Sequence, residues 1–371
     1  MPYRYSTGDE RLDEDLAAIV ERFGPSLNAD LIHQMMVTCC KLVKDGTERG
    51  DVKILNTTLK EMRYAFKVFS PYRRLRKVSL FGSARCGSDT DDYKQAVAFA
   101  EEIARRGFMI ITGAGHGIME AGNRGAGRDM SFGVNIRLPF EQVANDYIAH
   151  DKKLVNFKYF FTRKLAFLKE THGIVCSPGG FGTHDEGLEV MTLVQTGKSH
   201  MLPIVFMHPE GGTFWTDWHN YVTDRLLTRG MISPEDLSLY KITDNYLDAC
   251  DEVTRFYRRY HSMRYVRDFL IIRLEAPLNS DEVEQLNDEF SDLLKSGRIE
   301  TCEALKEETD ADIRHLPRLK MHFRRRSFGR LRQMVDRINS FPLPYECVVE
   351  VPEAGEGGQI PDEIDDGEIS G

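Results

Sequence analysis

The stretch that decides the fold is residues 173–186, which read GIVCSPGGFGTHDE. A short apolar run leads into a loop with three glycines, Gly179, Gly180 and Gly182, and a helical pattern follows. Glycine has no side chain, so backbone N–H groups of such a loop can approach an anion closely, and the positive end of the helix dipole points to the same place. The stretch therefore predicts a buried strand, a phosphate-binding loop and a helix.

Two polar residues of this stretch add chemistry to the loop. We expect the helix to run from Thr183 to Thr196, so that Thr183 caps it and also donates its hydroxyl to a phosphate oxygen. Glu186 is then expected in the first helical turn, with its carboxylate toward the ligand. The alternative is a tight strand-to-helix turn in which an acidic residue is favoured by the helix dipole alone.

The pattern of strand, glycine loop and helix occurs twice more, earlier in the chain. The run Val78–Phe81 leads into Gly82-Ser83, and Phe108–Thr112 leads into Gly113-Ala114-Gly115-His116-Gly117. Strands that alternate with helices form a parallel sheet, and ligands bind at the carboxyl ends of its strands. We predict an α/β fold with a Rossmann-like, doubly wound parallel sheet whose three glycine loops gather at one edge. Further strands are expected at 131–138 and 203–207, and helices at 93–106, 118–127, 160–171 and 214–229.

The glycine loops favour a mononucleotide as the ligand. Ile118 stands where the third glycine of a GxGxxG dinucleotide motif belongs, and the chain has no P-loop motif. Arg163 and Lys164, at the start of a predicted helix, can bring a guanidinium over the same edge to hold phosphate or ribose oxygens. The alternative is that they are solvated charges in a first helical turn.

The sequence predicts that the chain consists of four parts. Residues 1–75 show helical periodicity in three segments, and 76–255 form the predicted nucleotide-binding catalytic domain. Residues 256–350 alternate short strands with two helices, which is typical of a small α+β domain, and one of these helices is expected at 280–295 with Ser280 as its cap. The acidic stretch 351–371 is expected to be disordered.

Composition limits the class of protein. The 371 residues carry a net charge of −9, which makes nucleic acid an unlikely general partner, and no apolar run approaches the roughly 20 residues that cross a bilayer. The seven scattered cysteines show no metal-ligand spacing, so no metal site is predicted. No secretory signal precedes the first helix, so we expect a cytoplasmic protein without a membrane partner.

A basic stretch in the C-terminal region allows a second binding hypothesis. It contains Arg318, Lys320, Arg324, Arg325, Arg326, Arg330 and Arg332. Such a cluster can bind an anionic effector, such as a regulatory nucleotide, or RNA. The alternative is a charged face that pairs with the excess acid of the chain.

These motifs together resemble the LOG family, the cytokinin riboside 5′-monophosphate phosphoribohydrolases formerly described as lysine decarboxylases. The family pattern PGGxGTxxE, preceded by an Arg-Lys pair, reads here as residues 178–186 with Arg163-Lys164 before it. The segments Phe81–Ala84 and Thr112–Glu120 resemble its first and second glycine motifs, and Leu138–Gln142 resembles a segment whose acidic residue contacts substrate. The similarity covers about residues 77–228.

The resemblance implies a homodimer or larger assembly that hydrolyses a nucleoside 5′-monophosphate to free base and ribose 5-phosphate, without a cofactor or metal. Arg163 and Glu186 take the catalytic positions. Substrate binding is implied for Gly82, Ser83, Gly113, Gly115, Glu141, Lys164, Gly179, Gly180, Phe181, Gly182 and Thr183. The additional N- and C-terminal regions resemble the long bacterial members, which look like general nucleotide nucleosidases, so AMP is the first expected substrate.

A protein of another class would use the same loops. A carrier or binding module holds a nucleotide, or a nucleotide-like cofactor, in glycine loops without turnover. The presence of both Arg163 and Glu186 favours the enzyme, because binding of phosphate does not need a carboxylate. Lysine decarboxylation is disfavoured, since it generally needs pyridoxal phosphate held by a lysine and no such site is evident.

Overall fold

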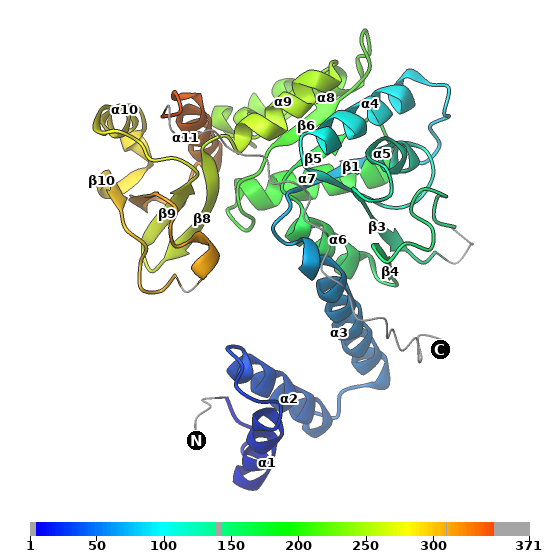
Figure 1. Ribbon diagram of the computed structural model, residues 1–371, viewed down its shortest axis with the longest axis vertical. Coiled ribbons are helices and arrows are strands. Elements are labelled where there is room, and N and C mark those ends of the chain that lie inside the picture. Colours follow the sequence, from blue (N-terminus) through cyan, green and yellow to red (C-terminus); the bar gives the residue numbers. More distant parts are fainter. Residues whose placement is uncertain (1–4, 139–142, 309, 345–371) are drawn as a thin grey trace. The chain divides into compact units, whose positions relative to one another are not determined.

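The computed structural model describes residues 5–138, 143–308 and 310–344 (Figure 1). Contacts divide the chain into two compact units, Met1–Arg63 and Tyr64–Gly371. The second unit contains both the parallel sheet and the small C-terminal sheet. No helix of the described ranges is long and apolar enough to cross a membrane.

The first unit is helical, as the periodicity predicts. It contains α1 (Glu10–Glu21), α2 (Ala29–Lys44) and the first part of α3 (Arg49–Phe69). Asp9 caps α1 by accepting from the backbone N–H groups of Arg11 and Leu12. The boundary between the units falls inside α3, so the last turns of this helix belong with the sheet, although the sequence placed all of it in the N-terminal extension.

The central sheet confirms the predicted Rossmann-like α/β class. Its seven strands are parallel and follow the order β4-β3-β2-β1-β5-β6-β7. They are β1 (Lys77–Phe81), β2 (Met109–Thr112), β3 (Ser131–Ile136), β4 (Leu154–Phe157), β5 (Ile174–Cys176), β6 (Ile204–Met207) and β7 (Tyr240–Thr243). The direction of winding reverses between β1 and β5. This reversal is the topological switch point, where such sheets bind ligands.

Helices cover both faces of the sheet (Figure 1). The helices are α4 (Asp91–Arg105), α5 (Ile118–Ala126), α6 (Phe160–Glu170), α7 (Phe181–Gln195), α8 (Phe214–Tyr221) and α9 (Tyr246–Phe256). Helix α4 packs on both α5 and α9, whereas α6 contacts β3 and β4 and α7 contacts β5. Every residue of β1, β2, β3, β5 and β6 is buried, as expected for parallel strands covered on both sides.

The sequence missed both edge strands of this sheet. Strands β4 and β7 have four residues each and are only partly buried, so neither produces a continuous apolar run. The predicted helix 214–229 is also wrong in detail, because α8 ends at Tyr221 and continues as the π-helix η2 (Val222–Leu227). A short 3-10 helix, η3 (Pro234–Leu239), then leads into β7.

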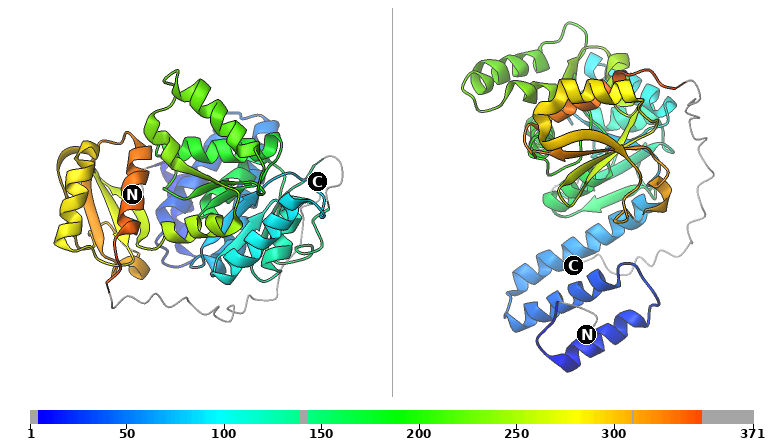
Figure 2. Two further views of the ribbon diagram at one scale, coloured as in Figure 1. Left: turned by 90° about the horizontal axis from the view of Figure 1, so that it is seen from above. Right: turned by 90° about the vertical axis from the view of Figure 1, so that its left-hand side faces the viewer.

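The C-terminal region folds as an antiparallel sheet with the order β10-β11-β9-β8. Its elements are β8 (Tyr260–Val266), β9 (Phe269–Leu274), α10 (Ser280–Phe290), η4 (Ser291–Leu293), β10 (Leu294–Cys302), η5 (Ala311–Ile313), β11 (Arg318–Phe323) and α11 (Phe328–Ser340). Helices α10 and α11 lie along one face of the sheet (Figure 2). The predicted cap Ser280 is wrong: Asn279 caps α10 in a reciprocal box with Glu282, and residues 294 and 295 of the predicted helix belong to β10.

Helix α11 packs directly on the domain that contains the parallel sheet. A methyl group on Gly329 would lie 2.1 Å from the carbonyl oxygen of Glu235 in η3, and one on Gly197, just after α7, would lie 2.0 Å from the ring of Phe328. Asn339 accepts from the N–H groups of Arg259 and Tyr260 and donates to the carbonyl of Phe256. These contacts join the small sheet to α7 and to the end of α9.

The basic stretch is divided between the core and the surface: Arg318 and Arg332 are buried, whereas Arg324, Arg325 and Arg326 are exposed. Arg318 and Arg273 are buried on either side of the Glu308 carboxylate, with nitrogen to oxygen distances of 2.9 and 2.6 Å. Arg332 is buried between Glu252 and Asp336. Two further arginines, Arg324 and Arg330, bond to the Leu294 carbonyl and to Asp292. This pairing favours the charged-face interpretation over an effector site at these arginines.

Replacing Glu308 is expected to destabilise the protein. The Glu308→Gln change leaves two buried guanidinium groups without their countercharge, which costs about 3–5 kcal/mol in the free energy of unfolding measured with urea. Burial alone would raise the pKa of Glu308, but bonds from the Leu305 N–H, Arg273 and Arg318 hold it below its ordinary value. Its stabilising contribution is therefore present near neutral pH and is lost as the pH falls through that lowered pKa.

The exposed pair Glu300–Lys320 on the same sheet provides the control. Glu300→Gln should change the free energy of unfolding by less than about 1 kcal/mol. Equal effects of the two substitutions would contradict a special role for the buried cluster.

Candidate active site

The loops after β1 and β5 meet at the switch point. The N–H of Ser83 donates to the carbonyl of Pro178 at 3.0 Å, and the N–H of Ser177 donates to that of Phe81 at 2.8 Å. A methyl group on Gly179 would lie 2.2 Å from Thr183 Oγ1 and 3.0 Å from the carbonyl carbon of Gly82. Glycine at 179 is therefore required by protein packing, independently of any ligand.

The loop after β2 joins the other two. The N–H of Ile118 donates to the carbonyl of Ser83 at 3.1 Å, and Gly117, with a φ of +65°, lies so close that a methyl group there would be 2.2 Å from the same oxygen. The side chain of Ile118 in turn fills the space beside Gly82. The structure thus brings the three predicted glycine loops together at one edge of the sheet.

Arg163 extends from the first turn of α6 across the end of β3. Its Nε donates to the carbonyl of Val134 at 2.9 Å, and its Nη2 would lie 2.5 Å from a methyl group on Gly113. Burial lowers the pKa of Arg163, and the charge of Glu186 opposes that shift. Arg163 is therefore a half-buried group held over the second glycine loop and not a solvated charge.

The position of Glu186 differs from the sequence prediction. Helix α7 begins at Phe181 with Gly180 as its cap, so Thr183 is inside the first turn and is not the cap, and Glu186 lies in the second turn. A methyl group on Gly180 or Gly182 would meet no atom within 4 Å, whereas Thr183 lies directly beside Gly179. Glu186 is buried, with 8% of its surface exposed, and among the described residues its carboxylate has no hydrogen bond or ion-pair contact.

The burial of Glu186 and the charges near it suit a group that accepts and donates a proton. Burial raises the pKa of its carboxyl, while the positive charges of Lys164 and Arg163 oppose that shift. A carboxylate with a raised pKa and no hydrogen-bond partner is a stronger base than an exposed one. Perturbed groups of this kind are concentrated at functional sites.

Lys164 is engaged by the protein. Its Nζ lies 2.7 Å from both Asp185 and Glu189 of α7. These pairs tie α6 to α7, and the charge of Lys164 acts on Glu186 from that position. The pairing holds the two helices together. Direct contact of Lys164 with a substrate stays a prediction.

The remaining predicted contacts are distributed around the loops. Thr183 is buried, whereas the ring of Phe181 is 96% exposed and points away from the core. Glu141 lies outside the described residues.

His116 of the second glycine loop is part of a small polar cluster. Its Nδ1 lies 3.2 Å from Glu120, which also accepts from Tyr93. Sequence motifs gave no signal for this small polar cluster.

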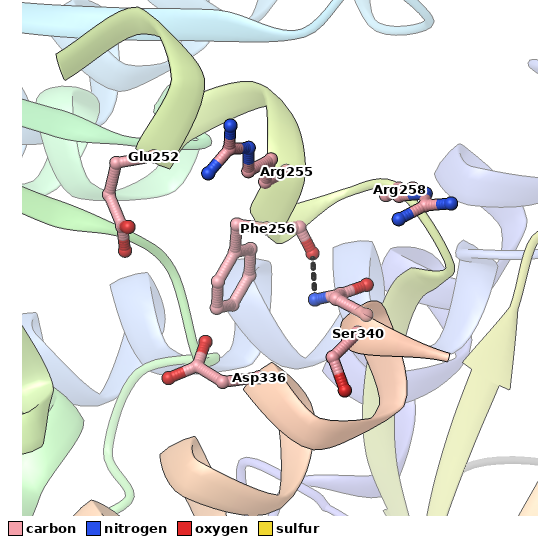
Figure 3. A pocket seen from close by; sticks show the side chains of 7 residues that line it. Glu252, Arg255, Phe256, Arg258, Asp336 and Ser340 are labelled. Carbon is pink, nitrogen blue, oxygen red and sulfur yellow. Dashed lines mark hydrogen bonds between the residues drawn. The ribbon is translucent and has the colours of Figure 1, made fainter. Parts of the chain in front are cut away.

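A separate cavity of about 470 Å³ lies between α9 and α11 (Figure 3). Its lining includes Glu252, Arg255, Phe256, Arg258 and Asp336. Two of these carboxylates are already paired with the buried Arg332. The cavity is formed by neither the glycine loops nor the two predicted catalytic residues.

Known proteins resemble part of this chain. The model of a family described as "Possible lysine decarboxylase" matches residues 112–253. A probable cytokinin riboside 5′-monophosphate phosphoribohydrolase of Oryza sativa subsp. japonica is 23% identical over 43% of this chain and 75% of its own length. A cytokinin riboside 5′-monophosphate phosphoribohydrolase of Arabidopsis thaliana is 22% identical over 43% of this chain and 74% of its own length.

Solved structures show likeness to the same region. The molybdenum cofactor binding protein from Rippkaea orientalis is 14% identical, with a TM-score of 0.36, over 48% of this chain and 96% of that one. The Moco carrier protein from Chlamydomonas reinhardtii is 17% identical, with a TM-score of 0.34, over 49% of this chain and 96% of that one.

The sheet order and the three loops at its switch point define a Rossmann-like protein with a candidate ligand site at the carboxyl ends of β1, β2 and β5. Within that class, the family match and the curated relatives confirm the resemblance predicted from the motifs. The region of the parallel sheet is therefore similar to the LOG family.

Two glycines of the β5 loop differ in their surroundings, so substitutions at these positions should have different effects on stability. Gly179→Ala should lower the free energy of unfolding by about 1–3 kcal/mol, because its methyl group collides with Thr183 and Gly82. Gly180→Ala meets no protein atom within 4 Å and should leave the melting temperature unchanged. Thermal melts of both variants test this, and a large loss of stability in Gly180→Ala would contradict the loop geometry.

We expect the charge of Lys164 to influence the position of the acid limb of kcat/KM. We expect activity that depends on the ionised Glu186 carboxylate to be lost as the pH falls through its pKa, which burial raises. Lys164→Met removes a positive charge that lowers this pKa, so the acid limb of kcat/KM should move to higher pH. Lys169→Met, on the same helix but paired with Glu170, is the control and should leave the limb in place. A limb that does not move in Lys164→Met would exclude this coupling.

Proposed function

We propose that this protein hydrolyses the N-glycosidic bond of a nucleoside 5′-monophosphate, releasing the free base and ribose 5-phosphate. The observation that carries the proposal is the buried Glu186 carboxylate, which has no hydrogen-bond partner in the described structure and lies with Arg163 where three glycine loops converge. The phosphoribohydrolase names of the curated relatives support the same reaction class.

The proposed chemistry follows from the charge that develops on the substrate during the reaction. Breaking the bond between C1′ and the base nitrogen builds positive charge on the ribose ring, and a nearby carboxylate stabilises that state. The same carboxylate takes a proton from the water that attacks C1′, the leaving base takes a proton from solvent, and Glu186 then returns its own proton to solvent. The raised pKa of Glu186 favours the first of these proton transfers.

Arg163 holds the other end of the substrate. Its Nε is fixed by the Val134 carbonyl, which leaves the Nη groups to bind ribose or phosphate oxygens over Gly113. Binding energy from the phosphate end then keeps C1′ in place beside Glu186. AMP is our first proposed substrate, because the chain resembles the long bacterial members of the family, which look like general nucleotide nucleosidases.

A carrier of a nucleotide or nucleotide-like cofactor is the rival function. It would use the glycine loops and Arg163 in the same way but would gain nothing from a desolvated carboxylate. Burying a carboxylate without a hydrogen bond costs free energy, so its retention at this position is better explained by a reaction that uses it.

The test is to incubate the protein with AMP, GMP, IMP, CMP and UMP and to follow free base and ribose 5-phosphate by chromatography. We expect release by the wild type and a loss of at least about 100-fold in kcat for Glu186→Gln, which keeps the shape of the side chain but removes the base.

Exposed Glu210→Gln, in the loop after β6, is the matched control and should retain full activity. Tight binding of a monophosphate without release of any base would overturn the hydrolase proposal in favour of the carrier.

A further inference from the structure

The second glycine loop is held from inside by one buried side chain that the sequence motifs do not include. Asn145 is 2% exposed, and its Nδ2 lies 3.1 Å from the carbonyl oxygen of Ala114 and 2.9 Å from that of Gly115. Its backbone N–H also donates to Ala114 at 2.8 Å, and its Oδ1 accepts from the N–H of Tyr147. Asn145 therefore binds two successive carbonyl groups of the loop.

Two more buried residues complete this clamp. Asn123 Oδ1 lies 3.0 Å from Asn145 Nδ2 and accepts from Thr112 Oγ1 at 2.8 Å. The same Thr112 oxygen accepts from the N–H of Ala114 at 3.0 Å. Asn123 and Thr112 are fully buried. The loop is thus fixed through side chains from β2, from α5 and from the segment that follows β3.

The clamp enforces an unfavourable backbone conformation. Ala114 has a φ of +61°, in the left-handed region that residues with a side chain seldom adopt. Such a conformation persists only where the surrounding structure fixes it, and the bonds from Asn145 and Thr112 to Ala114 do so.

The direction of the loop's N–H groups follows from peptide geometry. In a trans peptide the C=O and the N–H of the next residue point to opposite sides, and the described chain has no cis peptide. Because the carbonyls of Ala114 and Gly115 point to Asn145, the N–H groups of Gly115 and His116 point away from it. Neither N–H has an acceptor among the described residues. Successive N–H groups with a common direction bind anions.

We propose that Asn145 is a positioning residue that holds the Gly115 and His116 N–H groups toward the 5′-phosphate of the ligand. The inference rests on the proposed function for the identity of the ligand. Asn145 touches no substrate in this scheme; it acts through the loop, and Asn123 and Thr112 fix its orientation.

The sharpest variant is Asn145→Asp. It keeps the size of the side chain and the Oδ1 that accepts from Tyr147, but it replaces the Nδ2 donor by an oxygen that repels the two loop carbonyls. The matched control is Asn287→Asp in α10. Asn287 makes the same kind of contacts, because its Nδ2 donates to the carbonyls of Val283 and Ile299 and its Oδ1 accepts from the Ile299 N–H.

Binding of AMP and of adenosine to both variants is measured by calorimetry, together with kcat, KM and the melting temperature. We expect Asn145→Asp to weaken AMP binding about tenfold or more, with a smaller than twofold change for adenosine, which has no phosphate. KM for the monophosphate should rise by more than kcat falls. Asn287→Asp should lower the melting temperature but leave both affinities within about twofold.

Three results decide the matter. Unchanged AMP affinity in Asn145→Asp, or equal losses for AMP and adenosine, would overturn the positioning role. A wild type that binds AMP but releases no base would overturn the hydrolase proposal alone, since the binding comparison still holds. A wild type that binds none of the five common monophosphates would overturn both.

Discussion

The backbone contact between the loops after β1 and β5 is the constraint on which the site depends. These two strands are neighbours in the sheet at the point where the direction of winding reverses, and the loops that follow them meet there. Gly179 lies against Gly82, and the two loops exchange hydrogen bonds through Ser83 and Ser177. This contact fixes where α7 begins, and therefore where Glu186 lies.

Two side chains from one neighbouring helix complete that arrangement. Arg163 and Lys164 are adjacent on α6 but do different work: the first extends over the β2 loop, and the second pairs with α7. The result is a carboxylate whose pKa is raised by burial, with two positive charges at different positions opposing that shift. The packing of α6 on α7 thus lowers a basicity that burial raises.

Much of this arrangement could be predicted from the sequence because its signals are local. Apolar runs followed by glycines identify β1, β2 and β5 with their loops, and the parallel order then places the loops at one edge. The first residue of α7 could not be predicted, since it depends on the fit of Thr183 under Gly179. Asn145 gave no signal either, because its partners Ala114 and Gly115 lie 31 and 30 residues earlier and are recognised only through the fold.

The basic stretch is a second case in which the role of a residue depends on partners that are distant in the sequence. Arg318 and Arg326 look alike in the sequence, yet Arg318 is fully enclosed by a carboxylate ten residues away and by carbonyl groups around it. Arg332 pairs with Glu252, which lies 80 residues earlier. Whether an arginine is a binding group or part of the core depends on such distant partners, and a count of charges along the chain cannot show it.

The contacts of helix α11 decide whether the chain can be divided into two independent modules. Asn339 closes the carbonyl end of α9, Phe328 covers Gly197 at the end of α7, and Gly329 lies against η3. A fragment that stopped near Phe256 would keep all seven parallel strands but would lose the surface that closes both helix ends. The nucleotide-binding domain and the small sheet therefore form one folding unit, and the chain is not two modules that can be exchanged separately.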